Sequence, residues 1–542
     1  MASEALEHAR RYEAETEKRI CLEERPAFHL SPRVGWMNDP NGFSFYRGEY
    51  HLFYQYHPYG SHWGPMHWGH AVSRDLLRWR HLPAALAPDM PYDRDGCFSG
   101  SAVTLPDGRQ MLLYTGVSGG VQTQCLALGN GLDYDKYPEN PVLDARQLPE
   151  GASLVDFRDP RIWREANGLY YAVVANYSTL PSRTKCAGEG ADARDLAGNV
   201  PKMASAAACG VLGNGSKAAS AASRGFLGTG HIREEEEGGQ ILLFRSEDGF
   251  HWQFDRKLAV NHHRLGRMWE CPDFFPLDGC QVLLASTTDM LPKGLEYAAG
   301  NGTICLLGKM DARTGEFLVE RDQAIDYGID FYAAQTLLAP DGRRLMVGWM
   351  QNWDTCRFHA HDLPWFGQMT LPRELSVRGG RLCQQPVGEL LACRRNGIIY
   401  EDVELADGEV SFSGIEGRVL DLEVELDVRR PELLRKFTVQ LARDDRCHTD
   451  LIFRPMENVL ELDREFSGFR FAMPHGRRAK VDVPDGRLRL RIILDRYSVE
   501  VFAGDGETVL TMTIYTDPSA DRIAFLADGR ATFTVRKYRL EL

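Results

Sequence analysis

An aspartate in a tight turn is the first residue of this chain that could do chemistry. Asp39 lies in the segment Trp36–Gly42, which reads Trp, Met, Asn, Asp, Pro, Asn, Gly. Pro40 fixes one backbone dihedral and Gly42 permits a sharp reversal, so the carboxylate is expected to be held at a strand edge. The alternative is an ordinary turn, because Asp-Pro and Asn-Gly pairs are mostly structural.

Two further acids, like Asp39, lie at the starts of repeated segments of the chain. Asp159 lies between Arg158 and a proline, and Glu270 follows Trp269. If the three acids converge, like charges raise each other's pKa, so at least one is expected to stay protonated near neutral pH and to serve as a general acid. This suits glycoside hydrolysis, in which carboxyls about 5–5.5 Å apart give retention and about 6.5–9.5 Å give inversion. The alternative for each acid is that it caps a turn or pairs with a surface cation.

A repeat predicts the elements that would bring these acids together. Five segments share one plan: a turn or acidic start, a short apolar strand, a polar hairpin and a second, strongly apolar strand. They are Asn38–Tyr56, Ser99–Gly116, Arg158–Asn176, Cys271–Ser286 and Ala333–Met350. Their starts are roughly sixty residues apart, except for one gap that is about fifty residues longer. Such a period predicts a five-bladed β-propeller whose first strands line a central axis.

An insertion accounts for the long gap. Residues 179–238 are rich in Ala, Gly and Ser and end in the run Glu234–Glu237, a composition typical of a flexible surface excursion. From about Ile399 apolar and charged residues alternate, which predicts half-buried antiparallel strands and a β-sandwich. The fold class is therefore all-β. The predicted organisation is an N-terminal helix over 1–25, a propeller over 26–378, a linker over 379–398 and a sandwich over 399–542.

Composition excludes several classes of function. The 542 residues carry a net charge of -13, which argues against a nucleic-acid or anionic-membrane surface and favours a small-molecule partner. No apolar run approaches the roughly 20 residues of a membrane helix. The N-terminus has no apolar stretch of the kind a secretory signal requires, and the 12 cysteines include no Cys-x-x-Cys pair. We therefore expect a cytoplasmic protein with reduced thiols and no metal centre.

Aromatic side chains near the same strand ends would suit a sugar. Small-ligand sites combine apolar walls with a few polar groups. The candidates are Trp36, Tyr54, Gln55, Trp63, Phe98, Trp269, Tyr332, Trp349 and Trp353. The alternative for each ring is ordinary core packing, in which aromatics dominate.

Five motifs resemble, in order and context, the signature blocks of glycoside hydrolase family 32. They are Trp36–Gly42, Phe98–Ser101, Phe157–Pro160, Trp269–Asp273 and Leu371–Leu375. The resemblance runs from about Phe28 into the C-terminal region, where Leu494–Phe502 also looks like the family. The insertion after Ser178 departs from the family pattern, which puts the local loop structure in doubt but not the chemistry.

The resemblance implies a five-bladed propeller followed by a β-sandwich, in agreement with the repeat count. It implies that Asp39 is a nucleophile that forms a fructosyl-enzyme and that Glu270 is the acid and then the base. It implies that Asp159, with Arg158, binds fructose hydroxyls and stabilises an oxocarbenium-like state. The fructose subsite would be completed by Asn38, Gln55, Trp63, Phe98 and Ser99. No metal or organic cofactor is implied.

Within the family, the chain most resembles enzymes that hydrolyse sucrose or sucrose 6-phosphate, so a retaining β-fructofuranosidase is predicted. Hydrolysis of short fructans, fructosyl transfer to another sugar and a non-catalytic sugar sensor are the alternatives. A phosphorylated substrate needs cationic partners, for which His262, His263, Arg264 and Arg267 are candidates; otherwise they form a solvated loop. The sequence does not predict an oligomeric state.

Overall fold

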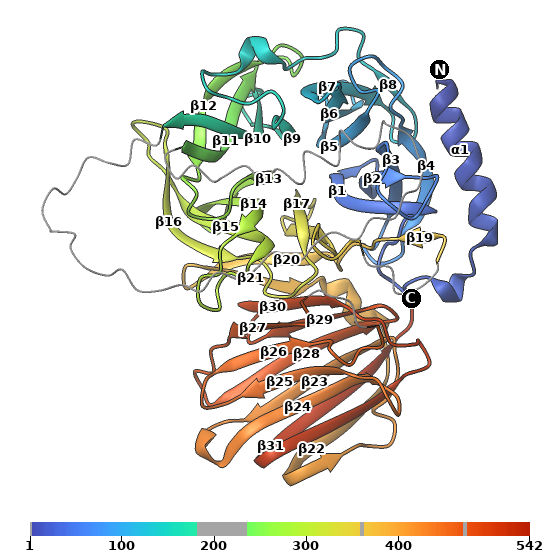
Figure 1. Ribbon diagram of the computed structural model, residues 1–542, viewed down its shortest axis with the longest axis vertical. Coiled ribbons are helices and arrows are strands. Elements are labelled where there is room, and N and C mark those ends of the chain that lie inside the picture. Colours follow the sequence, from blue (N-terminus) through green and yellow to red (C-terminus); the bar gives the residue numbers. More distant parts are fainter. Residues whose placement is uncertain (1–2, 182–235, 358–362, 470–473) are drawn as a thin grey trace, which may run out of the picture.

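The computed structural model describes the chain except for residues 1–2, 182–235, 358–362 and 470–473. Its described part is a five-bladed β-propeller followed by a β-sandwich, which confirms the predicted fold class (Figure 1). No helix in this part is long and apolar enough to span a membrane.

Each blade is an antiparallel sheet that uses four strands in chain order. Blade I contains β1 (Gly35–Tyr46), β2 (Glu49–His57), β3 (His67–Ser73) and β4 (Arg80–Leu86). Blade II contains β5 (Gly96–Thr104), β6 (Gln110–Ser118), β7 (Val121–Gly129) and β8 (Tyr134–Lys136). Blade III contains β9 (Arg158–Arg164), β10 (Tyr170–Pro181), β11 (Glu236–Ser246) and β12 (Gln253–Val260).

Blade IV contains β13 (Trp269–Leu277), β14 (Cys280–Met290), β15 (Gly300–Met310) and β16 (Phe317–Ala324). Blade V contains β17 (Tyr332–Leu338), β18 (Arg344–Trp349), β20 (Arg373–Arg378) and β21 (Arg381–Pro386). The short strand β19 (Trp365–Phe366) leaves blade V and pairs in parallel with the start of β1. It therefore links the last blade to the first and closes the ring.

The innermost strands β1, β5, β9, β13 and β17 begin within a few residues of the predicted unit starts. Blades pack against one another face to face, so strands inside each blade are buried on both faces. In β2, for example, all residues after Glu49 are buried. This packing brings the beginnings of all five innermost strands to one end of the axis, which we call the mouth.

The structure refines the predicted insertion. β10 and β11 pair up to Pro181 and Glu236, so residues 179–181 and 236–238 extend a hairpin of blade III instead of belonging to a loop. The remainder of the predicted insertion, 182–235, lies outside the described residues.

The structure also differs from the predicted linker over 379–398. Arg381–Pro386 forms β21, the outermost strand of blade V, and a 3-10 helix, η4 (Gly388–Cys393), follows before the sandwich begins. Gly379 and Gly380 have φ of +57 and +71, as a two-residue hairpin turn requires. A Gly-Gly pair between two short strands was the available signal for this hairpin.

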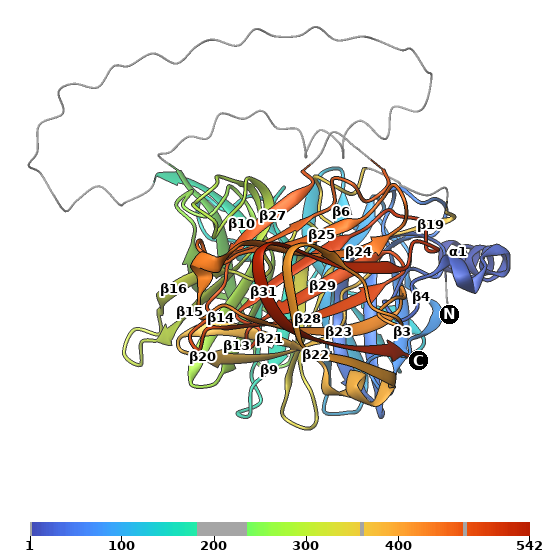
Figure 2. The same cartoon turned by 90° about the horizontal axis from the view of Figure 1, so that it is seen from below.

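The N-terminal helix α1 (Glu4–Thr16) lies along the outer side of blade I beside β4 in both views (Figures 1 and 2). The buried side chain of Glu13 accepts a hydrogen bond from the backbone N–H of Ala84 at 2.9 Å and pairs with Arg33 at 3.1 Å. Glu13 thereby satisfies a backbone N–H of β4, the edge strand of blade I. An unsatisfied edge strand would otherwise be open to pairing with another strand. Two 3-10 helices, η1 (Glu17–Arg19) and η2 (Leu22–Glu24), follow.

The described part of the sandwich contains ten strands. They are β22 (Arg394–Val410), β23 (Leu420–Asp427), β24 (Leu434–Arg443), β25 (Thr449–Arg454), β26 (Val459–Asp463), β27 (Gly476–Lys480), β28 (Arg487–Asp495), β29 (Ser498–Ala503), β30 (Thr508–Thr513) and β31 (Arg522–Leu540). The first half of β31 pairs with β24 and its second half with β23, so this long strand belongs to both layers. The predicted alternation is present: Leu420, Leu422, Val424 and Leu426 are all buried.

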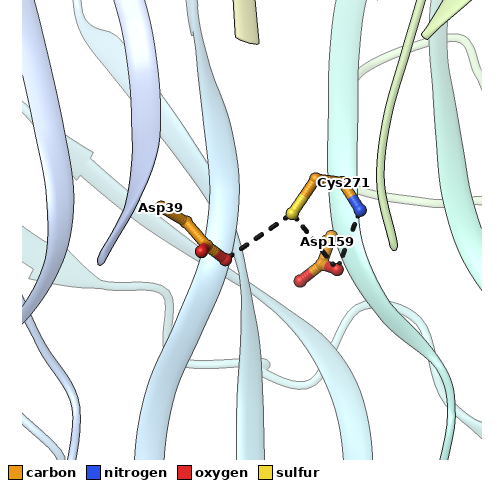
Figure 3. Close-up of side chains that lie close together, drawn as sticks. All are labelled: Asp39, Asp159 and Cys271. Atoms are coloured by element: carbon orange, nitrogen blue, oxygen red, sulfur yellow. Dashed lines mark hydrogen bonds between the residues drawn. The ribbon is translucent and has the colours of Figure 1, made fainter. Parts of the chain in front are cut away.

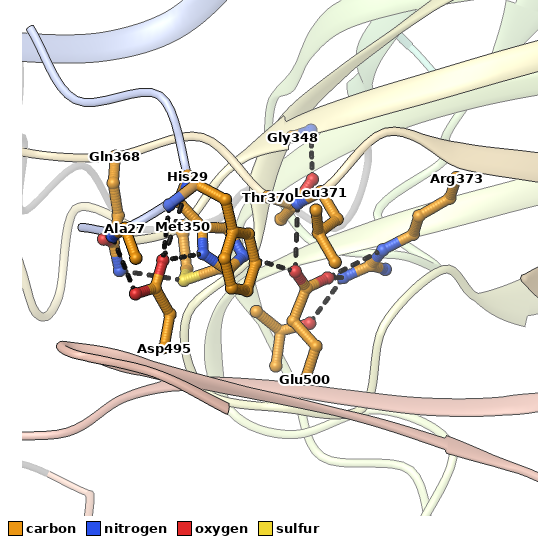
Figure 4. Close-up of polar contacts among 12 residues, drawn as sticks. Ala27, His29, Gly348, Met350, Gln368, Thr370, Leu371, Arg373, Asp495 and Glu500 are labelled. Carbon is orange, nitrogen blue, oxygen red and sulfur yellow. Dashed lines mark hydrogen bonds and ion pairs between the residues drawn. The ribbon is translucent and has the colours of Figure 1, made fainter. Parts of the chain in front are cut away.

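A buried ionic network joins the two domains (Figure 4). Nδ1 of His29 lies 2.8 Å from Asp495 and its Nε2 lies 2.8 Å from Glu500. Arg373 of blade V contacts Glu500 at 2.6 Å and Asp326 at 2.9 Å. All five side chains are fully buried. Burial opposes the charged imidazole, but the two carboxylates raise the pKa of His29 to about 9.

We predict that His29→Gln lowers the melting temperature below pH 8 and removes most of its alkaline dependence. A His whose folded pKa is raised from 6.5 to about 9 stabilises the fold fully below pH 6.5, and this stabilisation is lost as the pH rises through 9. Removing one partner of a buried ion pair costs about 3–5 kcal/mol. Melting temperatures at pH 6, 7.5 and 9.5 measure both effects. His251→Gln, in an exposed pair with Asp248, is the control; equal pH dependence in wild type and His29→Gln would contradict the prediction.

Candidate active site

Every innermost strand is irregular where it begins at the mouth. Its pairing register with the second strand is shifted there, a β-bulge that turns a side chain out of the ladder. The shifts lie between Met37 and Pro40 in β1, Phe98 and Gly100 in β5, Arg158 and Arg161 in β9, Glu270 and Asp273 in β13, and Tyr332 and Gln335 in β17. Pro40 explains one of them, because proline cannot donate to the ladder. The bulges present side chains of five blades to one place.

Asp39 is held by neutral donors. Its carboxylate accepts hydrogen bonds from the hydroxyl of Ser99 at 2.6 Å and from the amide of Asn38 at 3.0 Å. The oxygen of the Asn38 amide in turn accepts from the indole N–H of Trp36 at 2.7 Å, which fixes the amide's orientation. Burial raises the pKa of Asp39, and the bonds from Ser99 and Asn38 oppose this rise. The negative charge of Glu270 raises the pKa further, so the two acids interact.

Both oxygens of Glu270 are engaged. Oε1 accepts from Nη2 and Nε of Arg158, at 2.8 and 3.1 Å. Oε2 accepts from the hydroxyl of Tyr332 at 2.6 Å. Burial, followed by the charge of Glu270, raises the pKa of Tyr332 well above its ordinary value, so this hydroxyl keeps its proton and donates. Arg158 also contacts Asp156 at 3.1 Å and therefore links two acids at the mouth.

Asp159 and Cys271 complete the centre (Figure 3). The backbone N–H of Cys271 donates to Asp159 at 3.0 Å, and its Sγ lies 3.5 Å from Asp39 and 3.6 Å from Asp159. Asp159 and Cys271 adopt φ of +61 and +49, strained values for residues other than glycine that cluster at functional sites. Burial raises the pKa of Asp159 to about 7; Glu270 and Asp39 add to the rise and Arg158 opposes it. Asp159 therefore changes between its protonated and ionised forms near neutral pH.

One group of side chains at the mouth has the spacing of a metal site. Single ligand atoms of Asp39, Asp159 and Cys271 lie within 4.8 Å of one another. Burial, followed by the charges of the nearby acids, raises the pKa of the Cys271 thiol well above its ordinary value. Metals bind the thiolate and not the thiol, so a metal here would have to displace this proton. The absence of a metal cofactor stays a prediction.

The predicted aromatic residues divide into two groups. Trp63 and Phe98 are partly exposed, with ring centroids 6.1 Å apart, and can offer faces or edges to a ligand. Trp36, Tyr332 and Trp349 are at most 2% exposed and pack behind them in one cluster. Gln55 is also buried, and its amide donates to the backbone oxygen of Cys97 at 2.9 Å. Of the other candidate rings, Trp353 packs against this cluster, whereas Tyr54 and Trp269 belong to other core clusters.

Sequence reasoning missed two members of this centre. Cys271 lies in the motif Trp269–Asp273, next to Glu270, but the sequence suggested no role for it. Phe366 stacks on Trp36 with centroids 5.1 Å apart, yet it comes from the two-residue strand β19, whose sequence carries no pattern of its own. Of the basic candidates, Arg267 lies over the ring of Tyr177 at 5.8 Å, at the blade III side of the mouth.

Comparison with known proteins gives the family. The model of the glycosyl hydrolases family 32 N-terminal domain matches residues 29–186 and 227–386, and that of the family's C-terminal domain matches 389–540. The chain belongs to glycosyl hydrolase family 32. Membership identifies this family 32 protein as an enzyme that hydrolyses glycosidic bonds.

Relatives cover almost the whole family 32 chain. It is 35% identical over 94% of its length to a sucrose-6-phosphate hydrolase of Zymomonas mobilis, of which it covers 90%. It is 34% identical over 94% of its length to a raffinose invertase of Escherichia coli, of which it covers 93%. A solved β-fructofuranosidase mutant of Bombyx mori, in complex with sucrose, is 31% identical with a TM-score of 0.77, covering 100% of this chain and 99% of that one.

We predict that chelation leaves this family 32 enzyme active. Because the Cys271 thiol stays protonated, dialysis against EDTA should not change the initial rate of glycoside hydrolysis, and adding back Mg²⁺, Ca²⁺ or Zn²⁺ should not raise it. Initial rates before and after dialysis test this. Loss of activity that a divalent cation restores would show that the mouth holds a required metal.

Proposed function

We propose that this family 32 enzyme is a retaining β-fructofuranosidase that hydrolyses sucrose or sucrose 6-phosphate. The observation that carries the proposal is the pairing at the mouth of two carboxyls with different surroundings. Asp39 has only neutral hydrogen-bond donors, whereas Glu270 lies between the Arg158 guanidinium and the Tyr332 hydroxyl. Unlike environments for two neighbouring acids allow one to act as nucleophile and the other as acid and base.

In the proposed first step, a carboxylate oxygen of Asp39 attacks the anomeric carbon of the fructosyl unit. Ser99 and Asn38 fix the direction of this carboxylate, so little reorganisation is needed. Glu270, in its protonated form, gives its proton to the glycosidic oxygen as the bond between that oxygen and the anomeric carbon of fructose breaks. The product is a covalent fructosyl-enzyme, and glucose or its phosphate leaves.

In the proposed second step, Glu270 removes a proton from water, which attacks the fructosyl-enzyme and frees Asp39. General acid–base help of this kind contributes about 10²–10⁴-fold. Asp159 and Arg158 would bind fructose hydroxyls in both steps and stabilise the positive charge that develops on the ring. Gln55, Trp63 and Phe98 would form the remainder of the fructose subsite.

Three considerations support this substrate class. The relatives include proteins named for sucrose 6-phosphate and raffinose, and a solved neighbour holds sucrose. Raffinose contains a sucrose unit, so all three share the fructosyl bond that the mechanism breaks.

A cytoplasmic location is part of the proposal, and the ten described cysteines form no disulfide, as in reducing compartments.

We predict release of fructose from both sucrose and sucrose 6-phosphate, measured as kcat/KM on one preparation. If the exposed Arg264 contributes to phosphate binding, Arg264→Gln lowers kcat/KM for the phosphate alone. If Arg264→Gln changed kcat/KM equally for both substrates, the loop that carries Arg264 would be ordinary surface and not a phosphate site. Release of fructose from neither substrate would overturn the proposed function.

We predict separable effects for the two acids. Asp39→Ala should abolish turnover of sucrose and of fructosyl fluoride, because both need the nucleophile. Glu270→Gln should lower sucrose turnover by about 10²–10⁴-fold but largely spare the formation of the fructosyl-enzyme from the fluoride, whose leaving group needs no proton. Burst kinetics with the fluoride separate the two steps.

Product stereochemistry tests retention directly. With methanol as the acceptor, a double displacement gives methyl β-fructofuranoside, which nuclear magnetic resonance distinguishes from the α-anomer. The α-anomer would contradict the covalent intermediate.

Asp107→Asn, at an exposed turn, is the control for removing an acid without touching the mouth.

A further inference from the structure

A second buried ion pair crosses the domain interface, apart from the His29 network. Nη1 of Arg464, which follows β26 of the sandwich, lies 2.5 Å from Oδ2 of Asp330 in the propeller. Both side chains are fully buried. The same Oδ2 accepts two hydrogen bonds from Thr513 of β30, from its backbone N–H at 2.9 Å and from its hydroxyl at 2.7 Å. Three donors of the sandwich therefore fix one oxygen of a propeller carboxylate.

The other oxygen of Asp330 reaches a turn at the mouth. Oδ1 accepts from the hydroxyl of Thr355 at 2.9 Å. Within this turn, Oδ1 of Asn352 accepts from the backbone N–H of Asp354 at 2.8 Å and of Thr355 at 3.2 Å. The amide of Asn352 also donates to the backbone oxygen of Ile329. The turn 351–356 is thus fastened to the segment that carries Asp330.

Two routes lead from Asp330 to the reacting groups. Along the chain, Asp330 precedes by two residues Tyr332, whose hydroxyl is 2.6 Å from Glu270. Through the turn, Trp353 packs edge-on against Trp349 at 5.1 Å. Trp349 packs in the same way at 6.0 Å against the indole of Trp36, which orients the amide that binds Asp39. One carboxylate therefore supports the surroundings of both proposed acids.

We infer that Asp330, fixed by Arg464 and Thr513, is a positioning residue through which the sandwich sets the geometry of the active site. Charge-assisted hydrogen bonds in a buried place are short and directional, so they define a position sharply. A displacement of about 1 Å at a reacting group can cost on the order of 10²-fold in rate. The kinetic part of this inference rests on the proposed function.

The strand β30 offers a matched pair of variants. Thr513 and Thr511 lie two residues apart on the same face, and both are at most 5% exposed. The hydroxyl of Thr511 donates to Asp326 at 2.6 Å and accepts from Arg373 at 2.6 Å, within the His29 network and not towards the turn 351–356. Thr513→Val and Thr511→Val each remove one buried hydroxyl from the interface, but only the Thr513 hydroxyl bonds to the carboxylate of Asp330. Thr511 contacts Asp330 through its backbone oxygen, which the substitution keeps.

We expect Thr513→Val to lower kcat/KM for sucrose about tenfold and Thr511→Val to change it less than about twofold, although both lower the melting temperature. Assays are run well below the melting temperature of either variant. Thr513→Ser keeps the hydroxyl and should restore most of the rate. Equal losses in the two valine variants, or no loss in Thr513→Val, would overturn the inference and leave the ion pair a purely structural contact.

Amide hydrogen exchange gives a readout that does not depend on turnover. The peptide 351–356 should exchange faster in Thr513→Val than in wild type, and at the wild-type rate in Thr511→Val. If the wild-type protein hydrolyses neither sucrose nor its phosphate, the proposed function fails while the exchange experiment still tests the positioning role. Unchanged exchange in Thr513→Val would refute that role even in an active enzyme.

Discussion

Three carboxyl groups are buried at one mouth beside the guanidinium of Arg158, and the rest of the structure depends on holding them there. Desolvation opposes the charged form of each acid. Hydrogen bonds to each acid offset this cost. Asp39 accepts them from Ser99 and Asn38, and Glu270 accepts them from Arg158 and Tyr332. Asp159 accepts one from the N–H of Cys271. As a result, the pKa values of Asp39 and Asp159 are raised above their ordinary values.

Such an arrangement requires a rigid frame, because each of these hydrogen bonds weakens if the acids move away from their partners. The propeller supplies it by ring closure: β19 pairs the end of blade V with the start of β1. The bulges and the positive φ angles of Asp159, Cys271 and Ala333 store strain at the mouth. Packing of blade against blade over-determines these positions, so the strained conformations persist.

The sandwich is joined to this frame by buried ionic contacts. Two buried networks join it to blade V, one through His29, Glu500 and Arg373 and one through Arg464 and Asp330. The first also binds the backbone N–H of Leu371, within a family motif, at 2.9 Å. Buried pairs are costly to form and costly to break, so they favour one relative placement of the domains over others. That placement is what a positioning role requires.

The sequence by itself determined what depends on local pattern. Strand alternation and a period near sixty residues indicated five blades and a sandwich. Turn chemistry marked Asp39, and the starts of repeated segments marked Asp159 and Glu270. It missed β21, read as linker, and β19, which has two residues. Only the tertiary structure decided the pairing of Arg464 with Asp330, 134 residues apart, and the place of Cys271 between two acids. Such contacts depend on which strand ends lie together in space, and a local sequence pattern does not contain that information.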